Sequence, residues 1–170
     1  MISGYFGKSN SGKTYLLKKH IKKYKNNIIF DINNEYNISN KYDINDVDNI
    51  IKAYFNNDLP LSIIPVDINQ EVIYFIYKYV KNVNIIIEDI DIYKNTLFDK
   101  IITVSRHKNV SIYYTCRRPQ NISKLLLFQT NNFYIFNTVE SNTLKKYIEF
   151  GFNIDKIKKL KKYQYVVYKY

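Results

Sequence analysis

Apolar runs and amphipathic stretches alternate along the whole chain. Runs that are apolar at nearly every position are typical of strands buried on both faces of a sheet. Such runs predict strands at 1–6, 27–31, 83–89, 110–116, 132–137 and 164–169, with a further extended run at 61–66. Stretches whose apolar residues recur every three to four positions predict helices between them. These helices are expected at 13–25, 45–57, 69–81, 93–107, 120–129 and 143–150, and a basic turn or helix at 156–162.

Strands that alternate with helices favour one fold class. We expect an α/β fold with a mainly parallel central sheet and helices on both faces. At 170 residues, with no internal repeat, linker or low-complexity tail, the chain is expected to form a single domain over 1–170. The first predicted strand begins at residue 1, so no accessory domain is expected before it.

The loop after the first predicted strand carries the strongest local signal. Its sequence GKSNSGKT, from Gly7 to Thr14, matches the phosphate-binding pattern G-x-x-x-x-G-K-[ST] in full. Glycines let backbone N–H groups wrap around a phosphate chain, Lys13 reaches the β- and γ-phosphates, and Thr14 ligates Mg²⁺. We therefore expect ATP and Mg²⁺ to bind at this loop. The expected nucleotide contacts are Gly7, Lys8, Ser9, Asn10, Ser11, Gly12, Lys13, Thr14 and Tyr15.

Lys8 allows a different interpretation of the same loop. A lysine directly after the first loop glycine is typical of the deviant P-loop ATPases of the partitioning type. Those proteins also favour glycine at the next two positions, which here are Ser9 and Asn10. This departure favours Lys8 as an ordinary variable residue of the loop.

Two adjacent carboxylates, Glu88 and Asp89, end the apolar run at 83–89. In a P-loop NTPase one carboxylate at this place holds Mg²⁺ through water, and its neighbour activates the attacking water. By position, Glu88 takes the metal role together with Thr14, and Asp89 takes the role of the catalytic base. The usual order is Asp then Glu, so the reversed order leaves the division of labour open.

The net charge and the cysteine content indicate which class of partner and which cellular compartment to expect. The net charge of +11 suggests binding to a polyanion such as nucleic acid, although a lysine-rich coding bias alone could produce it. The single cysteine, Cys116, excludes an internal disulfide framework and suits a reducing compartment. The chain has no secretory segment and no apolar run of the ~20 residues that a membrane span needs, so a cytoplasmic protein is expected.

The order of these features resembles the HerA/FtsK superfamily of P-loop ATPases, which have a RecA-like (ASCE) core. In that family the second strand commonly ends in an Asp followed four residues later by Glu and an aromatic residue, as do Asp31, Glu35 and Tyr36 here. The fourth strand commonly runs into a Thr-Gln-Arg-Pro-like segment, whose place is taken by 116–119. An apolar strand ending in Phe and a polar residue follows, as at 134–137. The similarity covers residues 1 to about 150.

The resemblance carries expectations about activity and partners. It implies Mg-dependent ATP hydrolysis that drives non-specific translocation of double-stranded DNA by a homo-oligomeric ring, a hexamer. A bare motor core without the barrel and extensions of the cellular members is most similar to a minimal viral genome-packaging ATPase. That role implies a capsid or portal-vertex partner and a location in the host cytoplasm or the virion. The family's polar sensor, usually Gln, is replaced here by Arg117.

All three arginines, Arg106, Arg117 and Arg118, lie close together in the sequence, on either side of the predicted strand 110–116. Arginine differs from lysine in its planar, always charged fork, which contacts phosphate bidentately. We expect Arg117 to sense the γ-phosphate in its own subunit. Arg106, at the opposite end of the strand, is expected to act on a neighbouring subunit as an arginine finger. Arg118 could take the finger role or a structural one.

Other residues leave alternatives open. DNA contacts are expected from lysine-rich segments at 94–95, 145–146 and 156–162, each of which could instead be a solvated face. His20 is expected to be solvated and His107 to lie at a helix end, and no cysteine–histidine cluster supports zinc. Two other functions remain open: an ATPase for assembly or extrusion of filamentous virions, and a P-loop kinase or nucleotide switch. A kinase should carry lid arginines and an acceptor-binding segment, and neither is evident.

Overall fold

The computed structural model describes residues 1–65, 69–93 and 97–170. Within these residues, eight strands form one sheet in the order β3-β4-β2-β5-β6-β1-β7-β8. The strands are β1 (Ile2–Phe6), β2 (Asn27–Phe30), β3 (Asn40–Asp43), β4 (Leu61–Ile64), β5 (Asn84–Ile87), β6 (Ser111–Cys116), β7 (Asn132–Phe136) and β8 (Tyr165–Lys169). Neighbouring strands pair in parallel, except that β8 pairs antiparallel with β7. The expected α/β fold with a mainly parallel sheet is confirmed.

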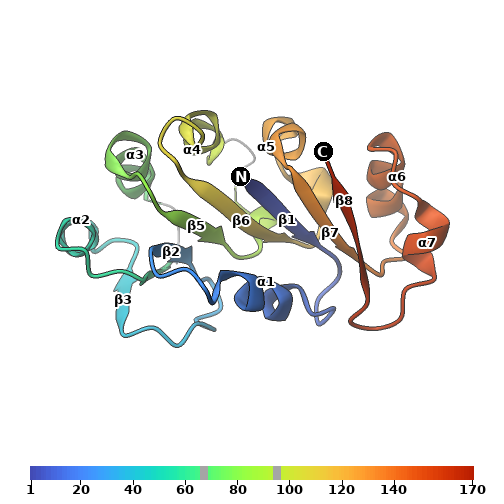
Figure 1. Cartoon of the computed structure of the whole chain (residues 1–170), viewed down its shortest axis with the longest axis horizontal. Helices are drawn as coiled ribbons and strands as arrows, with labels where there is room; N and C mark the ends of the chain where they lie inside the picture. Colours follow the sequence, from blue (N-terminus) through green and yellow to red (C-terminus); the bar gives the residue numbers. More distant parts are fainter. Residues whose placement is uncertain (66–68, 94–96) are drawn as a thin grey trace.

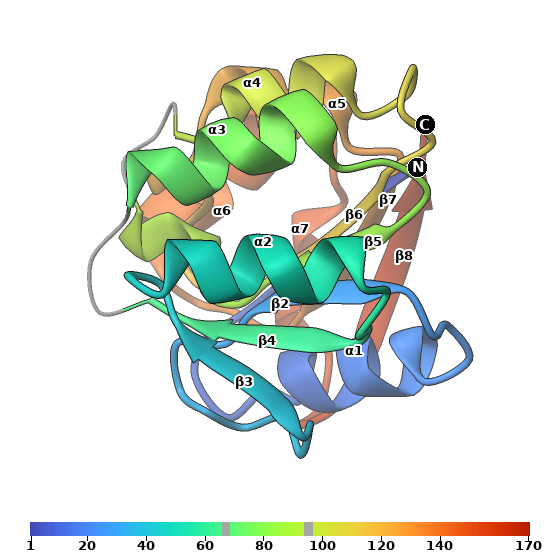
Figure 2. The ribbon, with the colours of Figure 1, turned by 90° about the vertical axis from the view of Figure 1, so that its left-hand side faces the viewer.

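Helices cover both faces of the sheet (Figure 1). The α-helices are α1 (Lys13–Ile21), α2 (Val47–Phe55), α3 (Gln70–Tyr79), α4 (Asp99–Val104), α5 (Lys124–Gln129), α6 (Ser141–Glu149) and α7 (Ile154–Lys158), with short 3-10 turns η1 (Ile90–Ile92) and η2 (Pro119–Asn121). Helices α2 to α5 lie side by side along one face, and α1 lies on the other (Figure 2). Helices therefore cover both faces of the sheet, as expected, but more of them lie on one face than on the other.

The alternation of side chains along each strand produces the two layers of the core. Ile85 and Ile87 of β5 point into the larger cluster beneath α2 to α5, and Ile86 between them points to the α1 side. Tyr114 and Tyr113 of β6 divide in the same way. A strand with apolar residues on both faces must be covered twice, which is why these runs are apolar at consecutive positions.

The carboxyl ends of the parallel strands meet along one edge of the sheet. The P-loop follows β1, Asp31 follows β2, Glu88 and Asp89 follow β5, and Arg117 follows β6. Strand β6 pairs with both β1 and β5, so it separates the P-loop strand from the strand of the carboxylates. Ligands of open α/β sheets bind outside this edge.

Several elements differ from the sequence-based expectation. The first helix ends at Ile21, four residues early, where Lys22 and Lys23 would continue it as like-charge neighbours, at a spacing of four, of Lys18 and Lys19. Of the helix expected at 93–107, the described part that is α-helical is Asp99–Val104. Strand β3 was not expected, because NKYD is a short polar edge strand with no apolar run. None of the described helices has the length and apolar character needed to cross a bilayer.

Candidate active site

The P-loop joins β1 to α1 and takes its shape from two glycines. A Cβ on Gly7 would lie 2.8 Å from both the Phe136 Cβ and the Ser11 Oγ, so a side chain does not fit there. Gly12, which precedes α1, has a φ of 101°, a left-handed conformation that favours glycine. The Gly7 N–H donates to the carbonyl oxygen of Cys116 at 3.1 Å, which ties the start of the loop to the end of β6.

Polar groups inside the loop are buried without full hydrogen bonding. The Lys13 side chain is 6% exposed, and its Nζ donates to the carbonyl oxygen of Lys8 at 2.9 Å. Burial lowers the pKa of Lys13, although Asp89, Cys116 and Glu88 act in the opposite direction. The buried Ser11 Oγ has no hydrogen-bond partner among the described residues. Buried polar groups normally find partners, so this loop fits an anion that would supply them.

Glu88 is a buried carboxylate that receives three hydrogen bonds. The hydroxyls of Thr115, Thr14 and Tyr36 donate to it at 2.7, 3.1 and 2.5 Å. Burial raises the pKa of Glu88 above its usual range, and the three hydrogen bonds oppose that shift. Thr14 and Glu88 therefore face each other with oxygen atoms, the ligand type that Mg²⁺ prefers when phosphates and waters complete its shell. Among the residues described, no three His, Cys, Asp or Glu side chains gather as a metal cluster.

Tyr36 reaches Glu88 because the loop after β2 is folded around Asp31. One Asp31 carboxylate oxygen accepts the Glu35 N–H at 2.8 Å, and the other accepts the Tyr36 N–H at 2.9 Å. Asp31 is fully buried, and the Ser62 hydroxyl donates to it at 3.4 Å. The spacing of Asp31, Glu35 and Tyr36 seen in the sequence is thus the spacing of a closed loop that carries a phenol to the acidic pair.

Asp89 has surroundings quite different from those of Glu88. Its backbone is left-handed, with a φ of 46°, and its N–H donates to the Thr115 hydroxyl at 2.7 Å. Its carboxylate turns toward Arg117, whose Nε lies 3.5 Å away. The two carboxylates therefore point in different directions. That of Glu88 points inward to Thr14, and that of Asp89 points outward to solvent and Arg117.

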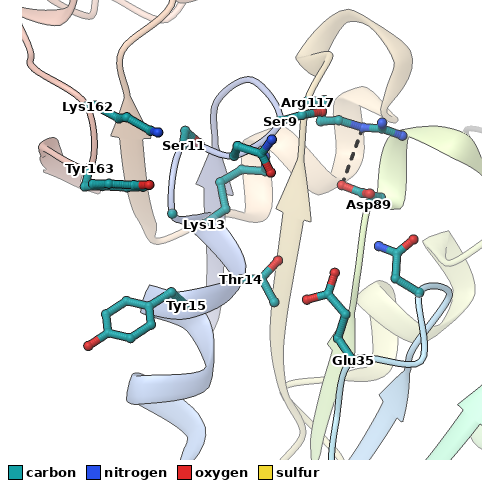
Figure 3. A pocket seen from close by; sticks show the side chains of 13 residues that line it. Ser9, Ser11, Lys13, Thr14, Tyr15, Glu35, Asp89, Arg117, Lys162 and Tyr163 are labelled. Atoms are coloured by element: carbon teal, nitrogen blue, oxygen red, sulfur yellow. Dashed lines mark ion pairs between the residues drawn. The ribbon is translucent and has the colours of Figure 1, made fainter.

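The P-loop, Asp89 and Arg117 line a cavity of about 690 Å³, here called the nucleotide cleft (Figure 3). Its lining residues are Ser9, Asn10, Ser11, Gly12, Lys13, Thr14, Tyr15, Asn33, Glu35, Asp89, Arg117, Lys162 and Tyr163. Most of the expected nucleotide contacts are brought together here. Gly7 and Lys8 do not line it, and the exposed Lys8 side chain lines a second cavity of about 420 Å³.

The three arginines are separated in space. Arg117 lines the nucleotide cleft, and Arg118 is exposed beside the second cavity. Their backbone N–H groups donate to the two carboxylate oxygens of Asp91 at 2.8 and 3.2 Å, which fixes the turn after β6. Arg106 is exposed at the amino end of β6, next to Met1, and does not line the nucleotide cleft. The finger role expected of Arg106 stays a prediction.

Sequence reasoning gave no nucleotide role to four residues that line the nucleotide cleft: Asn33 and Glu35, after β2, and Lys162 and Tyr163, before β8. It placed Lys162 in a lysine cluster for DNA and assigned Tyr163 no role. The structure brings Lys162 and Tyr163 to the cleft through the turn between α7 and β8. The DNA candidates at 94–95 lie outside the described residues, and Lys146 pairs with Glu149 at 2.6 Å. The roles predicted for individual residues stay predictions.

Comparison with known proteins shows where this fold occurs. No protein-family model and no curated protein matches the sequence. The genome packaging NTPase B204 from Sulfolobus turreted icosahedral virus 2, in complex with AMPPCP, has a similar structure with a TM-score of 0.80. The two sequences are 20% identical, and the match covers 99% of this chain and 91% of that chain. The same NTPase in complex with ATP-gammaS has a TM-score of 0.75 at 20% identity, with 99% and 91% covered.

A more distant similarity concerns the N-terminal domain of zonular occludens toxin from Neisseria meningitidis. Its TM-score is 0.53 at 15% identity, covering 81% of this chain and 76% of that chain. At such identities the similarity concerns the fold. The P-loop NTPase fold is confirmed, and so is the resemblance to a minimal viral packaging ATPase at the level of the fold.

Proposed function

We propose that this chain hydrolyses ATP in the nucleotide cleft with the help of Mg²⁺. One observation carries the proposal: the buried, under-bonded P-loop lies next to a carboxylate hydrogen-bonded to Thr14 and a second carboxylate open to the cleft. A site for binding alone would need the loop but not two carboxylates in different surroundings. The arrangement supports hydrolysis.

Each residue has a distinct task in this proposal. Lys13 and the loop N–H groups hold the phosphates, and Thr14 with Glu88 holds the metal ion. Bound Mg²⁺ would neutralise charge that develops on the phosphate oxygens. Asp89 accepts a proton from the attacking water while the bond between the γ-phosphorus and the bridging oxygen breaks. Arg117 would leave Asp89 and turn to the γ-phosphate.

Substitutions separate the tasks of the two carboxylates. Phosphate release and Mg-ATP affinity would be measured for Lys13→Ala, Glu88→Gln and Asp89→Asn. Asp89→Asn should keep nucleotide affinity and lose roughly 10²- to 10⁴-fold in turnover, the usual contribution of a general base. Glu88→Gln should weaken Mg-ATP affinity itself. If the two variants behave in the opposite way, the roles are exchanged, and full turnover in Lys13→Ala would exclude this cleft.

We further propose that hydrolysis moves double-stranded DNA, in the packaging of a viral genome. The net charge of +11 supports a polyanionic partner, and the fold similarity to a genome packaging NTPase extends over nearly the whole of both chains. On this view residues 1–170 act as one motor domain, and copies of it form a closed ring, a hexamer, that docks on a capsid or portal protein in the host cytoplasm.

DNA stimulation and mass measurement test the motor. ATP turnover should rise with double-stranded DNA of any sequence and fall back at high salt, because phosphate contacts release counterions. Light scattering with nucleotide and DNA should report a closed oligomer. A monomer whose turnover is indifferent to DNA would exclude DNA translocation, and DNA-independent turnover by an oligomer would favour virion assembly or extrusion.

A further inference from the structure

The nucleotide cleft has an aromatic wall that comes from the far end of the chain. Lys162 and Tyr163 lie in the turn between α7 and β8, and both line the cleft. In Figure 3 they lie on one side of Lys13, whereas Asp89 and Arg117 lie on the other. The P-loop thus runs between an acidic and arginine side and an aromatic side.

The turn that carries Tyr163 is held in place by hydrogen bonds. The Lys161 N–H donates to the Gln164 Oε1 at 2.9 Å, and the Gln164 N–H donates to the Lys161 carbonyl at 3.0 Å. Asn137, directly after β7, donates to the carbonyls of Lys158 and Leu160 at 3.0 and 2.8 Å. These contacts hold Tyr163 at a φ of 67°, a conformation that tyrosine adopts only where its surroundings impose it.

The phenol ring of Tyr163 lies against the P-loop without being covered. A Cβ on Gly12 would lie 3.2 Å from its Cδ1, so the glycine leaves room for the phenol. Tyr163 is nevertheless 61% exposed, and in the view of Figure 3 it lies between Lys162 and Tyr15. The Lys162 Nζ is 4.9 Å from the centre of the phenol. An exposed aromatic face beside a phosphate loop suits the flat face of a nucleobase.

The direction of a bound nucleotide follows from the chemistry of the two sides. The attacked γ-phosphate must lie near Asp89 and Arg117, because these groups act on the attacking water and the terminal phosphate. The nucleoside then extends to the opposite side of Lys13. We propose that Tyr163 is the nucleobase platform of the nucleotide cleft. This inference rests on the proposed function, and it adds that the base is recognised by its π-face.

Binding measurements with and without a base test the platform. Calorimetric titration would use ATP and inorganic tripolyphosphate, which has the phosphates but no nucleoside. Tyr163→Asn removes the phenol, and asparagine tolerates the left-handed backbone at this position. Tyr163→Phe keeps the aromatic face. Tyr74→Asn removes a tyrosine of similar exposure on α3, which lines a different cavity, and serves as the matched control.

Tyr163→Asn should weaken ATP binding roughly 5- to 150-fold, the range for losing one base stack, and leave tripolyphosphate binding unchanged. Tyr163→Phe and Tyr74→Asn should bind both ligands as the unchanged protein does. The inference is overturned if Tyr163→Asn binds ATP normally, if its affinities for both ligands fall equally, or if only its affinity for DNA falls. If the unchanged protein binds neither ligand, the proposed function fails and this inference with it.

Discussion

Glu88 is a carboxylate buried almost completely, yet it faces three hydroxyl donors and no cation among the described residues that bond to it. Burial of a charge is costly unless hydrogen bonds or a counterion offset it. The hydroxyls of Thr14, Tyr36 and Thr115 supply that offset and hold the carboxylate at one place. A metal ion would find this oxygen site already ordered, which reduces the cost of binding.

Tyr36→Phe tests this arrangement by removing one donor. A hydrogen bond to a charged, buried group contributes about 1.5–3 kcal/mol, so we expect the free energy of unfolding to fall by that amount. Urea unfolding followed by circular dichroism measures it. Tyr74→Phe, in an exposed tyrosine, is the control and should leave stability unchanged. Equal stability of both variants would mean that the Tyr36 hydroxyl does not stabilise Glu88.

Cys116 is a second residue whose chemistry is decided by burial. It ends β6 with no exposed surface, and burial raises the pKa of its thiol well above the usual range. We expect a thiol reagent to label the folded protein on the order of a hundredfold or more slowly than the urea-unfolded chain, because the thiolate forms only on opening. Asn142→Cys in a Cys116→Ser background provides an exposed thiol for comparison. Fast labelling of the folded protein would show that β6 opens locally.

At the scale of elements, α1 is fastened to the sheet by a polar contact within an aromatic layer. The His20 Nδ1 and the Tyr5 hydroxyl share a hydrogen bond of 2.7 Å, and Tyr134 stacks on Tyr5 with ring centres 4.7 Å apart. His20 was expected to be solvated, since its neighbours in sequence are lysines. It points inward because it follows the buried Leu16 by four residues, which places both on the same helix face.

Acid should weaken the packing of α1. Burial lowers the pKa of His20 in the folded protein, and Lys23 and Lys19 act in the same direction. The unfolded chain therefore binds this proton first as the pH falls, so stability should decrease below the ordinary histidine pKa of about 6.5 and level off below the folded pKa. Urea midpoints between pH 7.5 and 5 measure it.

The other histidine provides a matched control. His107 is exposed, so the His107→Gln variant should show the same pH dependence of stability as the unchanged protein. In the His20→Gln variant that dependence should be flatter. A His20→Gln variant with the full acid sensitivity would assign that sensitivity to other groups.

The fold was accessible from the sequence because its signals are local. Apolar runs such as 84–87 and the motif from Gly7 to Thr14 each predict their own element, and the alternation of elements predicts the sheet. Strand β3 was not predicted, because its polar residues are stabilised by pairing with β4, a contact distant in sequence. The lengths of helices α1 and α4 were overestimated, because periodicity does not mark where a helix ends.

The site was predicted only where its residues follow the ends of strands. The carboxyl ends of β1, β5 and β6 meet in any sheet of this topology, so Lys13, Glu88 and Arg117 could be grouped from sequence alone. Tyr163 carries no such signal, since its approach to Gly12 depends on how α7 and β8 return across the sheet. The contact between Tyr36 and Glu88 depends in the same way on tertiary structure.

At the scale of the whole molecule, the two ends of β6 face different surroundings. Arg117 follows its carboxyl end in the nucleotide cleft, and Arg106 precedes its amino end at the opposite edge of the sheet. In a closed ring of identical subunits joined head to tail, one edge of each subunit meets the other edge of its neighbour. Arg106 is then available to a neighbour's cleft.

Mixing two inactive variants tests this arrangement. Arg106→Ala should lose roughly 10³- to 10⁵-fold in turnover, as arginine fingers do elsewhere, and Lys13→Ala should be inactive. In rings assembled at random from equal amounts, about a quarter of the clefts combine an intact Lys13 with an intact neighbouring Arg106, so turnover should recover toward that fraction. Each variant alone, at the same total concentration, is the control. A mixture no more active than its components would exclude Arg106 as a finger in trans.

The Gly7 N–H donates a hydrogen bond to the Cys116 carbonyl, so the P-loop is attached directly to the carboxyl end of β6. The strand is buried from Ile112 to Cys116 and packed between β1 and β5, so it cannot shorten or buckle, because protein interiors resist compression. A displacement of the loop on product release would therefore be passed along β6 toward its amino end. In the proposed ring, the end of one subunit's cycle would then set when the cycle of its neighbour begins, and β6 would carry that timing between them.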